Sequence, residues 1–114
     1  MKPIWEVLLS KAEREVRIAQ QKLAEAQQKK NLALERREKL DQLMVEYSEQ
    51  LRSVQLRSHS TGEVGNYQQF IAQLQSMKIR SKQELSAHEE DCAIARKYMM
   101  LREHERLKIE LLAQ

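Results

Sequence analysis

The chain has very few of the residues that form turns or thick apolar cores. Its 114 residues include two glycines and one proline, and aromatic side chains make up only 4% of the chain. Charged residues account for 32%. This composition is typical of long solvated helices and not of a globular domain with a pocket. Because a pair of helices lacks a cleft that could exclude water from a substrate, we expect no enzyme and no small-molecule substrate.

A single cysteine and the lack of a long apolar run bear on the cellular setting. Cys92 has no second cysteine with which to form an internal disulfide, which favours a reducing compartment. The most apolar stretch, Ile4 to Leu9, is interrupted by Glu6 and is too short to span a membrane. It is better explained as the start of a helix, with Pro3 in the first turn. We therefore expect a cytoplasmic protein.

Neither the charges nor the metal-binding residue types form a dense cluster. The net charge is +3, with both signs mixed along the chain, so we expect no nucleic acid partner. His88 and Cys92 are four residues apart, a spacing that suits two metal ligands, but a site needs more than two. No glycine-rich phosphate loop, paired catalytic carboxylates or nucleophile motif is present. We expect no catalytic residue, metal site or cofactor.

The strongest pattern is a heptad repeat in the first half of the chain. Alanines recur every seven residues and are followed in phase by larger residues: Ala12, Ala19, Ala26, Ala33, Leu40, Tyr47 and Val54. A second series lies three or four positions away: Leu9, Val16, Leu23, Lys30, Arg37, Met44 and Leu51. Trp5 lies seven residues before Ala12, in phase with the alanines, so both series hold register from Trp5 to Val54. The two series predict one coiled-coil helix over residues 3–58.

A turn and a second helix should follow. Residues 59–66 hold both glycines, so they are the expected turn, and Asn66 with Gln69 can form a capping box for a helix over residues 67–114. Beyond Met99 the apolar stripe is expected to drift toward Leu101, Leu107, Leu111 and Leu112. The predicted seam is Tyr67, Ile71, Leu74, Lys78, Ser81, Leu85, His88, Cys92, Ala95, Met99, Arg102, Arg106, Ile109 and Ala113.

Two apolar stripes joined by a short turn should fold back on each other. The expected fold class is all-α, with two long helices forming an antiparallel coiled-coil hairpin as a single domain over residues 1–114. A turn centred between Gly62 and Glu63 would pair Leu40 with Leu85. That register leaves the first dozen residues of helix one without a partner, so either helix one protrudes or the sequence lacks a C-terminal continuation. In both cases Ile4, Trp5, Leu8 and Leu9 would form an unpaired apolar end for a partner or for self-association.

A second apolar stripe lies near the expected turn. Phe70, Leu74 and Met77 form a stripe beside the seam of the second helix, and Leu40, Leu43 and Tyr47 broaden the apolar face of the first. A two-helix coiled coil buries one stripe from each helix, so the second stripe is a candidate surface for another protein. The alternatives are a wide intramolecular interface or a homodimer formed through the same face.

The residues that open the second helix carry a resemblance. The run Asn66-Tyr67-Gln68-Gln69-Phe70-Ile71, followed by Leu74, resembles the FliJ family of the bacterial flagellar type III export apparatus. The likeness extends upstream to Lys39-Leu40-Asp41-Gln42-Leu43, with Tyr47 and Leu51, and the layout of helix, turn, motif and second helix covers the whole chain.

The resemblance implies a role without a reaction. Members of the family look like the central stalk of rotary ATPases, associate with the hexameric export ATPase, connect it to the export gate in the inner membrane, and engage export chaperones. It implies a cytoplasmic protein held peripherally at the inner membrane, at the flagellar base. The resemblance assigns the gate side to Leu40, Leu43, Tyr47, Phe70, Leu74 and Met77, and the ATPase side to Trp5, Leu8 and Leu9.

Two other functions are compatible with the sequence. The chain could be the equivalent stalk of a virulence-type injectisome. It could also be a basic coiled-coil hairpin that binds nucleic acid, although the aromatic residues gather near the turn while Lys29, Lys30, Arg36 and Arg37 lie further back along the first helix.

Overall fold

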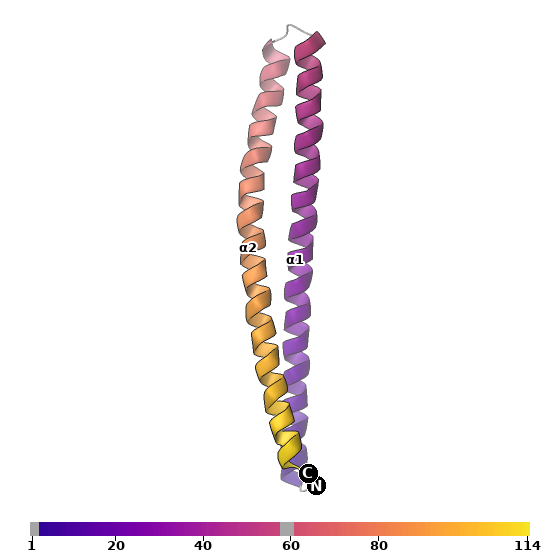
Figure 1. The fold of residues 1–114 in the computed structure, drawn as a ribbon, viewed down its shortest axis with the longest axis vertical. Coiled ribbons are helices and arrows are strands. Elements are labelled where there is room, and N and C mark those ends of the chain that lie inside the picture. The colour runs from indigo at the N-terminus through magenta and orange to yellow at the C-terminus, as the bar shows by residue number, and fades with distance from the viewer. Residues whose placement is uncertain (1–2, 58–60) are drawn as a thin grey trace. The chain divides into compact units, whose positions relative to one another are not determined.

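The computed structural model describes residues 3–57 and 61–114, and all but the last two of these are helical. Helix α1 spans Pro3–Arg57 and helix α2 spans Thr61–Leu112 (Figure 1). The described residues contain no strand. The predicted all-α fold of two long helices is confirmed.

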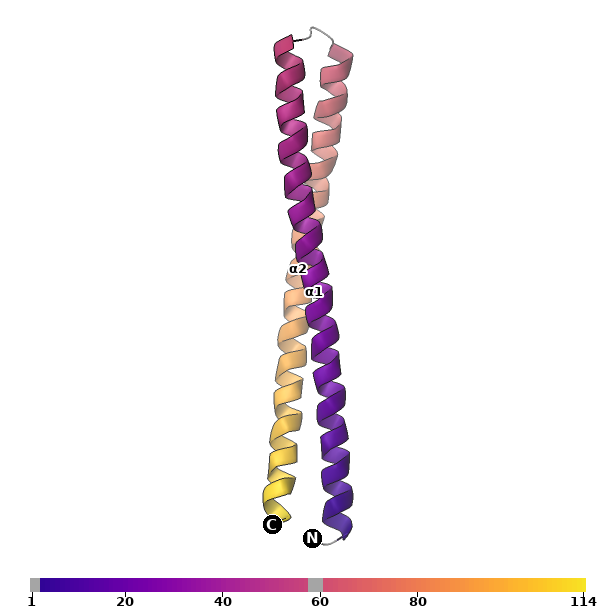
Figure 2. The same ribbon diagram turned by 90° about the vertical axis from the view of Figure 1, so that its right-hand side faces the viewer.

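The chain divides into two compact units, each made from a segment of both helices. Unit 1 comprises Met1–Lys30 and Ala87–Gln114, and unit 2 comprises Asn31–Ser86. In unit 2, Arg36 contacts Glu84 and Tyr47 contacts Phe70, so residues that come later in α1 meet residues that come earlier in α2. The helices of unit 2 are therefore antiparallel. In unit 1 the N-terminal end of α1 lies beside the C-terminal end of α2 (Figure 2).

The heptad pattern identified the buried face of both helices correctly. Every seam position named above is buried or half-buried, from Trp5 to Val54 in α1 and from Tyr67 to Ala113 in α2. The expected drift of the stripe beyond Met99 is wrong: Leu101, Leu107, Leu111 and Leu112 are exposed, whereas Arg102 and Arg106 stay half-buried in the seam. The spacing of the repeat, and not the local hydrophobicity, decides which residues face the partner helix.

The expected bounds of the turn and of the second helix require correction. Helix α2 begins at Thr61, so Gly62, Gly65 and Asn66 are helical and Asn66 does not cap the helix. Two helical glycines cost about 1 kcal/mol each. The longer helix adds Val64, which is half-buried at the seam position before Tyr67, and burial of its apolar side chain opposes this cost. The remainder of the expected turn, residues 58–60, lies outside the described residues.

The pairing of the helices also differs from the expected register. Arg36 Nη2 lies 2.6 Å from Glu84 Oε1, whereas a turn centred between Gly62 and Glu63 would place Arg36 opposite Glu89. A register shifted by one heptad, with Tyr47 opposite Ile71, accounts for the ion pairs and ring contacts that join the helices of unit 2. Because both seams repeat every seven residues, this shift keeps every seam residue in the seam.

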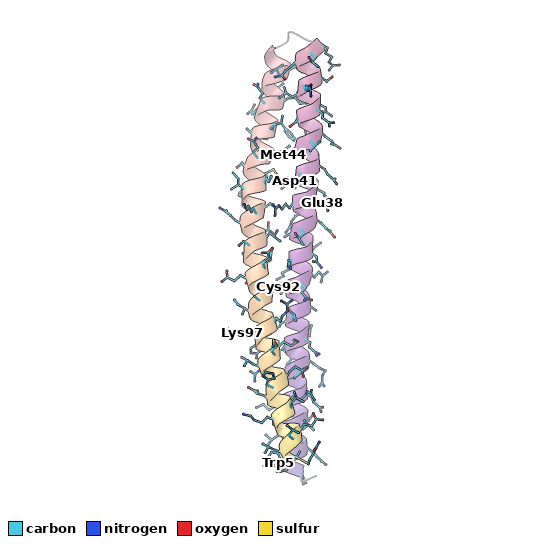
Figure 3. The ribbon with its side chains drawn as sticks, in the orientation of Figure 1. Trp5, Glu38, Asp41, Met44, Cys92 and Lys97 are labelled. Atoms are coloured by element: carbon cyan, nitrogen blue, oxygen red, sulfur yellow. The ribbon has the colours of Figure 1, made fainter. Side chains whose placement is uncertain are left out.

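The shifted register gives the N-terminal end of α1 partners on α2. Trp5 and Leu9 are half-buried, and Figure 3 places Trp5 beside the C-terminal end of α2. The expectation that helix one protrudes by about a dozen unpaired residues is therefore wrong. In the observed register Trp5 faces Ala113 and Leu9 faces Ile109, which are also half-buried.

The same register explains the alanines of α1 within unit 1. It places Ala12 opposite Arg106 and Ala19 opposite Met99. Ala12 and Ala19 are both buried. In this register small residues of α1 face larger ones of α2, a pairing that favours a close approach of the two helices.

Candidate partner-binding surfaces

An aromatic cluster joins α1 and α2 in unit 2. The ring centroids of Tyr47 and Phe70 are 4.5 Å apart at an interplanar angle of 52°, and those of Tyr47 and Tyr67 are 6.2 Å apart at 49°. Tyr47 and Tyr67 occupy seam positions, which the heptads turn inward, whereas Phe70 lies beside the seam. Tilted ring pairs of this kind contribute about 0.5–1.5 kcal/mol beyond the area that they bury.

Phe70 is only partly covered by this contact. Its side chain keeps 39% of its surface exposed, and Met77, one heptad further along α2, keeps 43%. Leu43 of α1 is 36% exposed and occupies the heptad position that flanks the seam on the same side. Together with the half-buried Leu40 and Tyr47, these residues form an apolar face that we call the turn-side surface: Leu40, Leu43, Tyr47, Phe70 and Met77.

Leu74 does not belong to this surface. It is only 3% exposed, since it lies in the seam between the helices of unit 2. In this conformation the side chain of Leu74 is covered by the chain itself, so its predicted contact with a partner stays a prediction that would require the seam to open. The sequence assigned Leu74 both to the seam and to the second apolar stripe. In the folded chain its side chain packs in the seam, where its apolar surface is buried against the other helix.

Two shallow hollows lie along unit 2. One, of about 370 Å³, is lined by Tyr47, Glu63, Asn66, Tyr67 and Phe70. The other, of about 390 Å³, is lined by Arg36, Leu40, Met77, Arg80, Ser81 and Glu84. Of the residues predicted for the gate side, Tyr47 and Phe70 thus line an aromatic hollow, and Leu40 and Met77 line one with charged side chains, whereas Leu43 and Leu74 line neither of the two.

Ion pairs cross between the helices of unit 2. Besides Arg36 and Glu84, Lys78 Nζ lies 2.8 Å from Asp41 Oδ1, although the approach is not aligned for a hydrogen bond and Asp41 Oδ1 accepts none from the described residues. Figure 3 shows Asp41 on α1 within this unit. Such exposed pairs contribute less than about 1 kcal/mol each, but they disfavour other registers. Sequence reasoning missed them, although charges that flank a heptad seam are a signal for such pairs.

A second apolar surface lies at the end of unit 1 where α1 begins and α2 ends. Of the three residues predicted for the ATPase side, Leu8 is 39% exposed and Trp5 and Leu9 are half-buried. Other exposed apolar residues lie near this end of the two helices: Ile4, Val7, Leu107, Leu111 and Leu112. We call Trp5, Leu8 and Leu9 with these neighbours the open-end surface. The assignment of Trp5, Leu8 and Leu9 to a partner stays a prediction, and the exposed C-terminal leucines, which the sequence had suggested for the seam, lie at the same end of unit 1.

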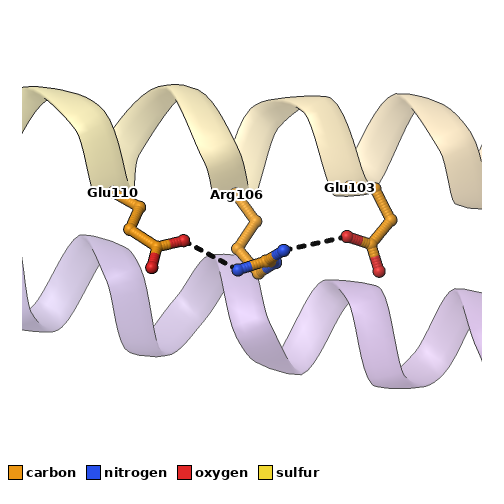
Figure 4. A network of polar contacts seen from close by, with 3 residues as sticks. All are labelled: Glu103, Arg106 and Glu110. Atoms are coloured by element: carbon orange, nitrogen blue, oxygen red, sulfur yellow. Dashed lines mark hydrogen bonds and ion pairs between the residues drawn. The ribbon is translucent and has the colours of Figure 1, made fainter.

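Two half-buried arginines of α2 are held by their own helix. Arg106 donates to Glu103 Oε2 at 3.1 Å and to Glu110 Oε2 at 2.8 Å (Figure 4). Arg102 donates to the Tyr98 hydroxyl at 2.8 Å and to Glu105 at 3.0 Å. The hydrogen bond to Glu103 is the main cause that raises the pKa of Arg106 above its ordinary value. The hydrogen bond to Tyr98 does the same for the pKa of Arg102.

Two cations of unit 1 lie close to the ring of Tyr98. The guanidinium carbon of Arg102 is 4.9 Å from its centroid and Lys22 Nζ, on α1, is 5.6 Å from it. This cation–π contact ties the two helices together at a point where the alanines bury little area.

Metal-binding groups and membrane-spanning stretches are both absent from the part of the chain that the structure describes. No group of three histidine, cysteine or acidic side chains within residues 3–57 and 61–114 could hold a metal ion. His88 and Cys92 both lie in the seam, with Cys92 buried and not in a disulfide. None of the helical residues that the structure describes forms a stretch long and apolar enough to cross a membrane.

The fold and these surfaces define a class: a two-helix coiled coil whose exposed apolar faces suit it to binding other proteins. The sequence matches the family described as Flagellar FliJ protein over residues 2–114, essentially the whole chain. The chain belongs to the FliJ family, whose members are coiled-coil components of flagellar type III export. Comparisons with curated proteins and with solved structures return no match.

Proposed function

We propose that this chain is the non-enzymatic stalk of the flagellar export apparatus, which associates with the hexameric export ATPase and links it to the export gate and to export chaperones. The observation that carries the proposal is the family match over residues 2–114, joined to a coiled coil with an apolar face exposed in each unit. A stalk between two partners needs two such faces and no pocket for a substrate.

The turn-side surface is the proposed contact with the gate. Phe70 supports this assignment because it is held by Tyr47 and still presents a large part of its ring to solvent. A ring that is fixed before binding loses little conformational entropy when a partner covers it, so it is well suited to be an interface anchor. Leu43 and Met77 extend the apolar area beside it.

The open-end surface is the proposed contact with the ATPase. Trp5 and Leu9 lie partly covered in the seam, and Leu8 lies next to them on the exposed side of α1. Apolar residues gathered on the exposed side of both helices would be costly without a partner. A location in the cytoplasm, peripheral to the inner membrane at the flagellar base, follows from these two contacts.

The decisive experiment measures binding with purified proteins and motility in cells. The hairpin, its Phe70→Ala/Met77→Ala variant and its Leu8→Ala variant would be mixed with the cytoplasmic domain of the gate protein and with the export ATPase of the same bacterium. We expect the double variant to lose the gate and keep the ATPase, and Leu8→Ala to show the reverse. Leu74→Ala is unsuitable because it would remove a core contact.

The motility assay separates the flagellar role from its alternatives. A strain lacking the protein should fail to swim and should regain motility with the wild-type chain but not with the double variant. A strain that swims normally but no longer secretes virulence effectors would overturn the flagellar assignment in favour of an injectisome. Failure of the wild-type hairpin to bind either purified partner would overturn the stalk proposal itself.

A further inference from the structure

Arg80 is a charge that the hairpin itself does not use. It lines the hollow of unit 2 with Leu40 and Met77, and it forms no hydrogen bond or ion pair with any residue in the described part of the chain. Its heptad position lies next to that of Met77 on the outer side of α2. An exposed arginine with no internal role, bordering an apolar surface, is suited to select a partner by charge.

The other charges of the hollow leave this cation uncompensated. Arg36 and Glu84 lie 2.6 Å apart across the helices, so each offsets the charge of the other. The side chains that line the hollow therefore carry one net positive charge, which is that of Arg80. The hollow thus favours an acidic group over a basic one.

The spacing along α2 defines the order of the contacts. Phe70 and Met77 are one heptad apart, about 10 Å along the helix, and Arg80 follows Met77 by about 5 Å. A segment that lies along α2 would therefore meet two apolar anchors first and the cation last. Guanidinium groups bind carboxylates in a bidentate manner, so an aspartate or glutamate of the segment fits this last position.

We infer that the turn-side surface takes an amphipathic acidic segment of its partner, with apolar side chains on Phe70 and Met77 and a carboxylate on Arg80. This inference rests on the proposed function, which supplies the gate protein as the partner, and it adds the chemistry by which that partner is recognised. Arg80 contributes to specificity, and the apolar residues supply most of the affinity.

The test compares Arg80 with a matched lysine on the same helix. Lys82 is exposed and two residues away, on the other side of α2, so Lys82→Glu makes the same change of charge outside the hollow. Binding of the purified gate cytoplasmic domain to the full-length hairpin would be measured at low and high salt. Circular dichroism would confirm that Arg80→Gln and Arg80→Glu fold like the wild type.

We expect Arg80→Gln to weaken binding about threefold and Arg80→Glu about tenfold or more, with the salt dependence reduced in both, while Lys82→Glu changes little. Unchanged binding of Arg80→Glu, together with loss of binding in Phe70→Ala/Met77→Ala, would overturn this inference and leave the proposed function intact. Equal losses in Arg80→Glu and Lys82→Glu would overturn it too, because the effect would then be one of net charge. No binding by the wild type would overturn both.

Discussion

The rings of Tyr47 and Phe70 pack against each other between α1 and α2, with their centroids 4.5 Å apart. The two residues differ in role, because Tyr47 lies in the seam and Phe70 lies beside it with part of its ring exposed. A single aromatic contact therefore joins the interior of unit 2 to its turn-side surface.

Replacement of these two residues should separate stability from binding. We expect Tyr47→Ala to lower the free energy of unfolding by about 2–4 kcal/mol, and Phe70→Ala by about 1 kcal/mol, because Phe70 is less buried. Urea unfolding followed by circular dichroism would measure both. In sedimentation, both variants should have the same oligomeric state as the wild type. A dimeric wild type with monomeric variants would show instead that this face is a homodimer seam.

Gly65 provides a test of where α2 begins. It is helical without a positive φ, and a Cβ added there would meet no atom within 4 Å. We expect Gly65→Ala to stabilise the protein by about 0.5–1 kcal/mol, since alanine loses less backbone freedom in a helix. Thermal unfolding would show this as a higher midpoint. A lower midpoint would place Gly65 in a turn.

The alanine at position 19 should not tolerate a larger side chain. Ala19 is fully buried, with 0% of its surface exposed, so Ala19→Leu should destabilise the protein by about 1–3 kcal/mol through overpacking. Ala24 is exposed on the same helix and serves as the control, because Ala24→Leu adds the same atoms to the surface. Equal unfolding midpoints for the two variants would contradict the tight packing around Ala19 that its burial indicates.

Engineered cysteines would distinguish the observed register from the one shifted by a heptad. In a Cys92→Ser, Met99→Cys background, the observed register places position 99 opposite Ala19. We therefore expect Ala19→Cys to form a disulfide on mild oxidation and Ala26→Cys to form none, because a disulfide needs Cα atoms within about 7 Å. Mobility on a non-reducing gel would report the bond. A disulfide in the Ala26→Cys variant alone would indicate the register expected from a turn at Gly62 and Glu63.

The arginines of unit 1 predict a pH profile. Because hydrogen bonds to Glu103 and Glu110 raise the pKa of Arg106, its contribution to stability is fully present below its ordinary value and is lost only as the pH rises through the higher folded value. The stability difference between wild type and Arg106→Met should therefore be the same at pH 7 and pH 10. Chemical unfolding at both values measures it, and a difference that shrinks by pH 10 would count against a raised pKa.

The sequence by itself determined the fold class and the buried face of each helix. A repeat of three and four residues turns the same positions inward over the whole length of a helix, so even polar members such as Lys30, Arg37 and Arg102 could be assigned to the seam and are half-buried there. The residues of the FliJ-like motif, from Asn66 to Ile71, likewise indicated the family that the full chain matches.

Only the tertiary structure decided the register, and with it the candidate surfaces. Seams that repeat every seven residues are equally compatible with pairings that differ by one heptad, so periodicity could not choose between Glu84 and Glu89 as the partner of Arg36. The choice depends on where α2 begins, and the packing of Val64 and Tyr67 outweighs the local preference of Gly62 and Gly65 for a turn. That register buries Leu74 and pairs Arg36 with Glu84, contacts between residues far apart in the chain that no local pattern records.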